Sequence, residues 1–233
     1  MSGTRDIHIG GNVDGGMIVV GDRNTVSSQQ LSSQQLSEPG KSPSKRKLLI
    51  LAANPKGSSR LRLDQEVRDI SEGLKRAEHR DKFEIAQRWA VRPRDFQRAM
   101  LEELPQIVHF SGHGEGEAGL YFEDEVGAPK LMPGSALASL FKLFSHKASI
   151  ECVVLNGCYS AAQAAAITQH VPYAIGMNQA IGDDAAIEFV VGFYDALGNG
   201  ESVEFAFESG KVSMELNGTG YENLPVLLVN SPT

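Results

Sequence analysis

Short apolar runs alternate with amphipathic stretches along the chain from about residue 45 onward. The runs inside residues 106–114 and 151–160 are β-branched and each is followed by glycine, which is typical of a buried parallel strand that stops in a tight turn. Between the runs, apolar residues recur at helical spacing, as from Leu63 through Val67 and Ile70 to Leu74. Strands that alternate with helices of these lengths predict an α/β fold, with a mostly parallel sheet and helices on both faces.

The expected elements follow one another from residue 48 to residue 229. Strands are expected at 48–53, 83–89, 172–178 and 226–229, and within the segments 106–114 and 151–160. Helices are expected at 63–79, 92–104, 133–144, 161–169, 183–197 and 202–216. A hairpin is expected between residues 119 and 131. Pro93 is compatible with the first turn of its helix, and Pro105 ends that helix.

The first 26 residues have a different pattern, in which short β-prone pieces are separated by glycine-rich turn signals. Residues 6–26 would form a small ribbon, which is only marginally stable in water unless it packs on something or stacks with copies of itself. We therefore interpret residues 1–26 as an interaction segment. It resembles the Gly/Asn/Val-rich amyloid-like signalling motifs at the N-termini of bacterial immune effectors, which implies recruitment to a partner with a matching motif. A flexible leader, or a ribbon that caps the main domain, is the alternative.

Residues 27–44 are rich in serine and glutamine, and the sequence Ser-Ser-Gln-Gln-Leu occurs twice, at 27–31 and 32–36. This stretch has too little apolar content to hold a fold, so we expect a disordered tether. The predicted organisation is an interaction segment at 1–26, a linker at 27–44 and one main domain at 45–233.

The composition narrows the classes of partner. The chain has 233 residues and a net charge of −7, with an isoelectric point near 5.4. With this acidic balance, it is not expected to bind nucleic acid or an anionic membrane, which would need a basic surface. Its two cysteines do not form a disulfide framework, and a free catalytic thiol requires a reducing compartment, so we expect a cytoplasmic protein. No apolar stretch is long enough to span a bilayer, and no secretory signal pattern is present.

Two of the expected strands end beside side chains that carry chemistry. His113 closes the segment 106–114, and Cys158 lies near the end of the segment 151–160. Open α/β sheets place ligands and chemistry at such strand ends. If the two strands are neighbours, a cysteine nucleophile and its base emerge at the same edge. A helix that begins beyond Cys158 would favour the thiolate, and the backbone N–H groups of Gly114 and Cys158 are candidates for an oxyanion hole.

A structural role is the alternative for both residues, because cysteine is among the most buried residue types and a histidine in a glycine loop often only caps backbone groups. Cys152 lies inside its apolar run and is expected to be buried and inert. His109 is expected to be a core histidine whose hydrogen bonds are satisfied. Without a Cys-x-x-Cys pair, neither a zinc site nor another metal is expected.

The sequence His-Phe-Ser-Gly-His-Gly at 109–114 is followed about 45 residues later by Val-Leu-Asn-Gly-Cys-Tyr-Ser at 154–160. This pair of motifs resembles the CHAT domains, caspase-like peptidases of the clan that includes caspases, separase and gingipains, and the resemblance extends from about residue 47 to residue 229. It implies a caspase-like three-layer sandwich, with His113 as general base, Cys158 as nucleophile and the Gly114 and Cys158 N–H groups as oxyanion donors. It also implies cleavage of a peptide bond through a thioester by a His-Cys dyad, without metal or organic cofactor.

Substrate contacts are expected from the strand at 173–178 and the loop after it, because in that family they line the pocket for the residue before the scissile bond. The local candidates are Met177, Asn178, Asp183 and Asp184, and one of the two aspartates would bind a basic side chain. The alternative is that an aspartate at this position caps the following helix. Acidic residues also gather beside His113, and they are expected to form a solvated surface, with repulsion of acidic peptides or gating as the alternative. These residues are Glu115, Glu117, Glu123, Asp124 and Glu125.

The leading hypothesis is therefore a cysteine endopeptidase that acts on a protein substrate as an effector in bacterial defence or signalling. It would be activated by a protein partner or by self-assembly through residues 1–26. The alternative from another class is a non-catalytic adaptor that keeps the caspase-like fold for assembly. A small-molecule hydrolase is disfavoured because the chain contains no Gly-x-Ser-x-Gly sequence.

Overall fold

A sheet of six strands forms the centre of the part of the chain that the computed structural model describes, residues 45–230. The strand order is β2-β1-β3-β6-β7-β8. The first five of these strands are parallel, and β8 runs antiparallel to β7. The strands span Arg46–Ala52 (β1), Phe83–Trp89 (β2), Ile107–Ser111 (β3), Cys152–Asn156 (β6), Tyr173–Met177 (β7) and Pro225–Val229 (β8).

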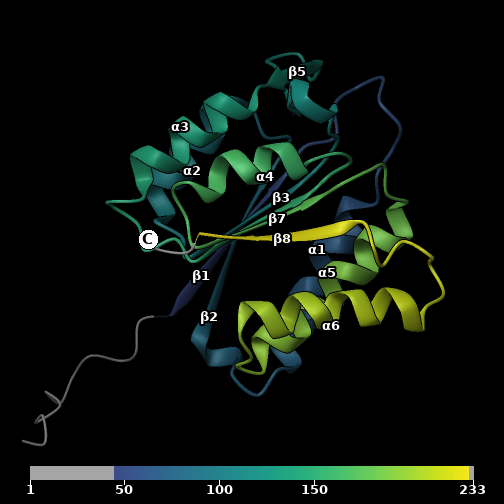
Figure 1. Ribbon diagram of the computed structural model, residues 1–233. Helices are drawn as coiled ribbons and strands as arrows, with labels where there is room; N and C mark the ends of the chain where they lie inside the picture. The colour runs from purple at the N-terminus through teal and green to yellow at the C-terminus, as the bar shows by residue number, and fades with distance from the viewer. Residues whose placement is uncertain (1–44, 231–233) are drawn as a thin grey trace, which may run out of the picture. The chain divides into compact units, whose positions relative to one another are not determined.

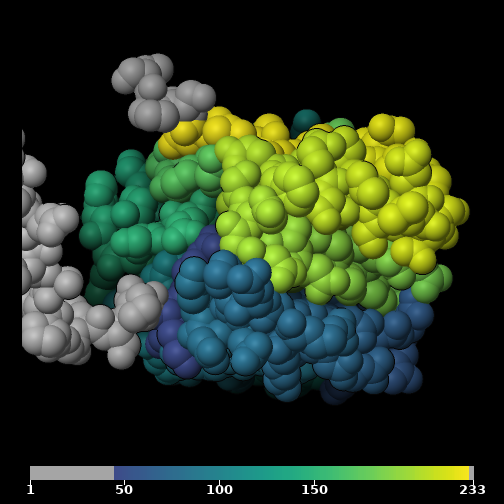
Figure 2. Space-filling model, turned by 90° about the horizontal axis from the view of Figure 1, so that it is seen from below, coloured from purple at the N-terminus to yellow at the C-terminus, as the bar shows by residue number. Residues whose placement is uncertain are grey.

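Helices cover both faces of the sheet. The first face carries α2 (Pro93–Glu103), α3 (Gly134–Phe144) and α4 (Ala161–Thr168). The second carries α1 (Leu63–Arg76), α5 (Asp183–Gly198) and α6 (Val203–Leu216). Figure 1 shows the two sets of helices above and below the strands, and Figure 2 shows the second face, where α1 in blue lies beside α5 and α6 in green and yellow. This three-layer arrangement confirms the α/β, caspase-like fold class.

The apolar runs are buried because both faces of each central strand are covered. In β3, Val108 and Phe110 join the core under α2, α3 and α4, while Ile107 joins the core under α1 and α5. In β6, Val153 and Val154 divide in the same way. Successive side chains of a strand point to opposite faces, so a strand that is buried on both sides reads as one continuous apolar run.

The elements differ from their predicted bounds by a few residues, mainly at the ends of helices. Helix α1 stops at Arg76 instead of near residue 79, because Ala77 has an extended backbone conformation, and a short 3-10 turn (η1, Arg80–Lys82) leads into β2. Another such turn (η2, Gly116–Ala118) precedes the predicted hairpin, which is formed by β4 (Leu120–Glu123) and β5 (Pro129–Met132) as a separate two-stranded sheet.

The predicted segments 1–26 and 27–44 lie outside the described residues. Across residues 45–230, every helix is too short or too polar to cross a bilayer.

The order of the strands creates a natural place for a site. Strand β1 lies between β2 and β3, so the chain first extends the sheet on one side of β1 and then on the other. Such a reversal leaves a crevice outside the carboxyl ends of the two strands, where open α/β sheets bind their ligands. The loop at 53–62 and the loop that contains His113 both emerge at this point.

Candidate active site

The loops after β3 and β6 lie against each other at the carboxyl end of the sheet. The two strands are parallel neighbours, with Ser111 opposite Asn156. A Cβ atom added to Gly114 would lie 2.0 Å from the carbonyl oxygen of Cys158, far inside any allowed contact. Glycine at position 114 therefore permits the close backbone approach that brings the loops of His113 and Cys158 side by side.

The ring of His113 is oriented by a backbone carbonyl from the loop after β1. Its Nε2 lies 2.8 Å from the carbonyl oxygen of Ser59. A carbonyl can only accept a hydrogen bond, so Nε2 carries the proton and, in the neutral ring, Nδ1 is the nitrogen with a free lone pair. His113 is thus held with Nδ1 as its basic atom. Sequence reasoning missed Ser59 because a main-chain oxygen leaves no side-chain signal.

Cys158 is partly exposed and contacts the loop that follows β7. Its Sγ lies 3.8 Å from the carbonyl oxygen of Ile181. The next residue, Tyr159, has a left-handed backbone conformation with φ of 53°, and α4 begins at Ala161. Within residues 45–230 no hydrogen bond joins the Cys158 thiol to the His113 ring.

Two backbone donors beside these side chains have no partner. An antiparallel bridge joins Gly114 to Leu120, and its hydrogen bonds use the N–H groups of Glu115 and Tyr121. The N–H groups of Gly114 and Cys158 donate no hydrogen bond within the described residues. Backbone N–H groups that are left free in this way can donate hydrogen bonds to a developing oxyanion.

A hollow lies on each side of this pair of loops. The first, of about 530 Å³, lies beside His113 and is lined by residues 55–59, 113–115, Tyr121 and Pro129. The second, of about 580 Å³, is lined by residues 182–185, Glu188, Asn217, Thr219 and Tyr221. It begins next to Ile181, the residue whose carbonyl Cys158 contacts. The first hollow thus includes His113 itself, and the second is bordered by the residues that follow Ile181.

The structure separates the four residues expected to contact substrate. Met177 is completely buried in the core under α1 and α5, so its side chain does not reach solvent. Asn178 is exposed, and its N–H donates to the Leu224 carbonyl at 2.9 Å. Asp183 and Asp184 line the second hollow.

Both aspartates are bound by Arg62, from the end of the loop after β1. Arg62 Nε donates to Asp183 Oδ2 at 2.7 Å, and another guanidinium nitrogen donates to Asp184. These hydrogen bonds raise the pKa of Arg62, the one donated to Asp183 most and the one donated to Asp184 next. The Asp183 side chain is 28% exposed and that of Asp184 is 86% exposed. The alternative expectation, that an aspartate caps α5, is wrong in position, because Gly182 occupies the N-cap and the aspartates lie in the first turn.

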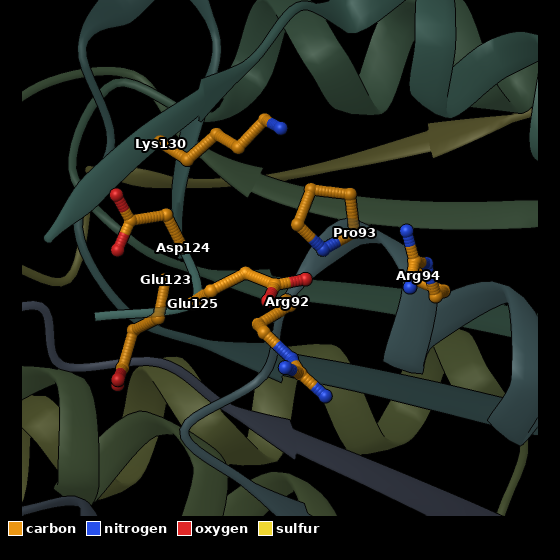
Figure 3. Close-up of a pocket in the computed structure, with 7 residues that line it drawn as sticks. All are labelled: Arg92, Pro93, Arg94, Glu123, Asp124, Glu125 and Lys130. Carbon is orange, nitrogen blue, oxygen red and sulfur yellow. The ribbon is translucent and has the colours of Figure 1, made fainter. Parts of the chain in front are cut away.

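The acidic residues of the hairpin have structural partners. They border a separate hollow of about 190 Å³ near the start of α2 (Figure 3). Glu123 accepts a hydrogen bond from the Asn54 N–H at 3.1 Å. Asp124 accepts from the N–H groups of Ala128 and Val126, which hold its pKa below the usual value. Arg92, on the opposite wall, is bound by Asp95 at 2.6 Å. The mixture of charges gives this hollow no preference for one sign.

The predictions that Cys152 and His109 are buried are confirmed. Cys152 is completely buried, and burial raises the pKa of its thiol well above the usual range, so it stays protonated. His109 is completely buried with both ring nitrogens bonded, to Glu66 and Tyr194. Glu66 was missed, although its position between Leu63 and Ile70 on the apolar face of α1 places it inward.

Within residues 45–230, no three or more His, Cys, Asp or Glu side chains are grouped to hold a metal ion.

Solved structures with this fold are caspase-like cysteine proteases. A secreted C11 cysteine protease from Bacteroides thetaiotaomicron has a TM-score of 0.56 at 13% identity, over 80% of this chain and 66% of that one. The Arg-specific gingipain R has a TM-score of 0.55 at 12% identity, over 79% and 46%. The Drosophila initiator caspase Dronc has a TM-score of 0.52 at 8% identity, over 92% and 93%. At these identities the likeness shows the fold alone, and that fold is of the caspase-like class.

Within this class, the chain belongs to the CHAT domain family, whose family model matches residues 18–219. The match includes both motifs, at 109–114 and 154–160. It confirms the resemblance to CHAT domains that these motifs indicated. It begins inside the segment 1–26, so the division of the chain at residues 26 and 44 stays a prediction.

Two curated relatives are longer proteins. A probable protease of Gillisia limnaea is 28% identical over 140 residues, which make up 60% of this chain and 25% of that protein. A Roc-COR-CHAT protease from an unknown prokaryotic organism is 27% identical over 169 residues, which make up 70% of this chain and 16% of that protein. The chain therefore spans a quarter or less of the length of these relatives.

Proposed function

We propose that the protein is a cysteine endopeptidase in which Cys158 is the nucleophile and His113 is the general base. The observation that carries the proposal is the pair of free N–H groups, at Gly114 and Cys158, in loops that touch beside the His113 ring. A buried structural cysteine has no use for such donors, whereas acyl transfer requires them. The fold shared with cysteine proteases and the protease names of both relatives support the same activity.

The proposed reaction begins with transfer of the thiol proton from Cys158 to His113 Nδ1, the nitrogen that Ser59 leaves unprotonated. The thiolate attacks the peptide carbonyl carbon, and the N–H groups of Gly114 and Cys158 stabilise the oxyanion. When the C–N bond breaks, His113 returns the proton to the leaving amine, and a thioester remains on Cys158. The same nitrogen then takes a proton from water, which attacks the thioester and releases the acid and the free thiol.

The roles of the two side chains assign the direction of the substrate. The leaving amine departs on the histidine side, so the segment after the cut lies in the hollow beside His113. The acyl part stays on the cysteine side, near Asn178 and the hollow bordered by the two aspartates. Arg62 binds both aspartates, but the Asp183 side chain is the more buried of the two, so the more exposed Asp184 is the stronger candidate to bind a basic side chain before the cut.

The test of the activity is cleavage of a peptide library by the full-length protein and by Cys158→Ala. Peptidase function predicts cleavage by the wild type and none by the variant. Cys152→Ala is the matched control, because it removes a thiol that is fully buried, and it is expected to keep the cleavage pattern. If the wild type cleaves nothing and Cys158→Ala keeps the cellular phenotype, the adaptor alternative replaces the peptidase.

We also propose that the peptidase acts in bacterial defence or signalling and is activated through residues 1–26. The β-prone, glycine-rich pattern of this segment and the tether that follows it support the proposal. Deletion of residues 1–44 is expected to abolish partner-dependent activity in cells while the isolated protein still reacts at Cys158. Unaltered cellular activity after the deletion would contradict this mode of activation.

A further inference from the structure

A carboxylate is buried directly beneath the two reactive loops. Glu66 lies in the first turn of α1 and is only 2% exposed. Its Oε1 accepts hydrogen bonds from His109 Nε2 and Asn156 Nδ2, both at 2.8 Å, and its Oε2 accepts one from Ser111 Oγ at 2.5 Å. His109 and Ser111 belong to β3, and Asn156 belongs to β6. One side chain on α1 thus bridges the two strands that lead into the loops of His113 and Cys158.

The hydrogen bonds of Glu66 join the ends of β3 and β6 at paired positions of the sheet. Ser111 and Asn156 are partners in the register of β3 and β6, and each is the last residue of its strand. His113 follows Ser111 by two residues, and Cys158 follows Asn156 by two residues. With so few residues between the bridge and the reactive groups, a shift at either strand end moves one reactive side chain relative to the other.

The donors around Glu66 match what a carboxylate can accept. Burial raises the pKa of Tyr194 well above its usual value, so its hydroxyl keeps its proton and donates to His109 Nδ1 at 3.1 Å. The neutral ring of His109 then donates from Nε2 to Glu66. Asn156 Oδ1 has no partner among the described residues. The Asn156 side chain is therefore held by the hydrogen bonds that its Nδ2 donates, one to Glu66 and one to the Ala186 carbonyl at 3.4 Å.

We propose that Glu66 is a positioning residue for the peptidase reaction. Its carboxylate fixes the relative placement of the ends of β3 and β6, and through them the separation between His113 Nδ1 and the Cys158 thiol. The inference rests on the proposed peptidase function. The negative charge is the property that glutamate adds, because one carboxylate accepts all three hydrogen bonds, and hydrogen bonds to a charged acceptor are the stronger ones. A neutral glutamine of the same shape would accept from His109 and Asn156 only through its oxygen and would have to donate to Ser111, so the Ser111 hydrogen bond would be reversed and the charge lost.

The decisive variant is Glu66→Gln in the full-length protein. A misplacement of about 1 Å in a catalytic pair lowers the rate on the order of 10²-fold, so kcat for a cleaved library peptide is expected to fall by about that factor at an unchanged KM. The rate at which iodoacetamide alkylates Cys158 is expected to fall with it, because His113 no longer takes the thiol proton efficiently. Cys152 does not contribute to the alkylation, because it is fully buried.

Ser111→Ala provides a second variant in case Glu66→Gln does not fold. It removes one hydroxyl group from the network and is expected to lower kcat and the alkylation rate in the same direction by about 10-fold, a partial form of the same misplacement. Thr168→Val is the matched control, because Thr168 is a buried hydroxyl on α4 that donates only to the Ala164 carbonyl. The control is expected to lower the melting temperature without changing kcat or alkylation.

Unchanged kcat and alkylation in the folded Glu66 or Ser111 variants would overturn the inference and leave Glu66 with a purely structural role. If the wild type cleaves no peptide, the proposed peptidase function fails, but the alkylation rate of Cys158 still tests the positioning. Slower alkylation in Glu66→Gln and Ser111→Ala, but not in Thr168→Val, would then support it, and equal rates in all variants would exclude it.

Discussion

The two faces of the central sheet bury different kinds of side chain, although the same strands supply both. Toward α2, α3 and α4, the ends of β3 and β6 present Phe110 and Leu155, within an apolar cluster. Toward α1 and α5, they present His109, Ser111 and Asn156, which are almost fully buried as well. The strand ends that face α2, α3 and α4 are apolar, and we call this the dry face. The face toward α1 and α5 has a polar inset directly under the candidate active site.

This difference separates stability from geometry. Burial of an apolar face stabilises the folded state roughly in proportion to the buried area. Exchange of one apolar side chain for another of similar volume costs only a modest amount of that stability. A buried polar group is tolerated only when its partners are present, so a network of them has one good arrangement and adds little net stability. We infer that the dry face holds the sheet together and that the polar inset fixes where the two loops begin.

The largest expected loss of stability is on the dry face. Phe141 on α3 is 1% exposed and packs edge-on against Phe96. Phe141→Ala removes most of a fully buried ring and is expected to lower the free energy of unfolding by about 3–5 kcal/mol, measured by chemical denaturation. The folded protein is expected to keep its kcat. Leu143→Ala, at an exposed position of the same helix, is the control and should change little. A fall in kcat like that expected for Glu66→Gln would remove the distinction between the faces.

A smaller loss is expected within the polar inset. Tyr194→Phe leaves the ring in place but removes the hydroxyl that donates to His109, so it should cost about 1–2 kcal/mol because a buried acceptor loses its partner. Tyr173→Phe is the matched control, since its hydroxyl bonds to Glu204 at the surface.

The Tyr194 hydroxyl also gives a pH dependence whose sign follows from the raised pKa of Tyr194 in the folded state. Below about pH 10, the usual pKa of tyrosine in an unfolded chain, the hydroxyl is protonated in both states and its contribution is fully present. Above that pH only the unfolded chain ionises, so the contribution is lost as pH rises. The stability difference between wild type and Tyr194→Phe should therefore shrink above pH 10. A constant difference would contradict the buried, protonated hydroxyl.

The fold could be predicted because its signals are local. The apolar runs, the helical spacing from Leu63 to Leu74 and the glycines after the strands each act over a few residues, and the alternation of strands and helices fixes the layers. His113 and Cys158 could be selected because each follows such a run. The helix ends were less accurate, since the stop of α1 before Ala77 depends on the backbone and not on a breaking residue.

The partners of the site could not be predicted, because they depend on contacts between residues far apart in the chain. The carbonyl of Ser59 leaves no signal in the side-chain pattern, although it orients His113. Arg62 and Asp183 are separated by 121 positions, so the aspartate reads as a free carboxylate until the fold is known. Glu66 lies on the inward face of α1, but the identity of its donors requires the register of β3 and β6.

A gain in stability is expected at Asp195, on the α5 side that faces α1. Its carboxylate lies so near α1 that a Cβ atom on Gly73 would be 2.3 Å from it. Burial raises the pKa of Asp195, with a smaller opposing effect from Arg76, so the ionised form is disfavoured in the folded state. Asp195→Asn should therefore raise stability at neutral pH by about 0.5–1 kcal/mol, within the usual range for single stabilising changes.

The sign can be checked by lowering the pH. An acid with a raised folded pKa contributes stability that is fully present below its unfolded pKa, about 3.9, and lost as pH rises through the folded value. The advantage of Asp195→Asn, measured as a melting temperature, should therefore vanish toward pH 4. Asp81→Asn, at an exposed aspartate, serves as the control. An advantage that persists in acid would point to packing and not to charge.

The smallest change in stability is expected for a substitution of Arg62. The same substitution tests whether the second hollow selects the substrate. Its side chain is 43% exposed, and exposed ion pairs contribute little to stability, so Arg62→Gln should hardly change the melting temperature. The change frees the carboxylates of Asp183 and Asp184, so peptides with Lys or Arg before the cut should be cleaved faster relative to those with Ala. Arg76→Gln, which breaks an exposed pair with Glu72 on α1, is the control. If Arg62→Gln leaves the ratio of basic to neutral substrates unaltered, the two aspartates hold the loop after β1 and do not select the substrate.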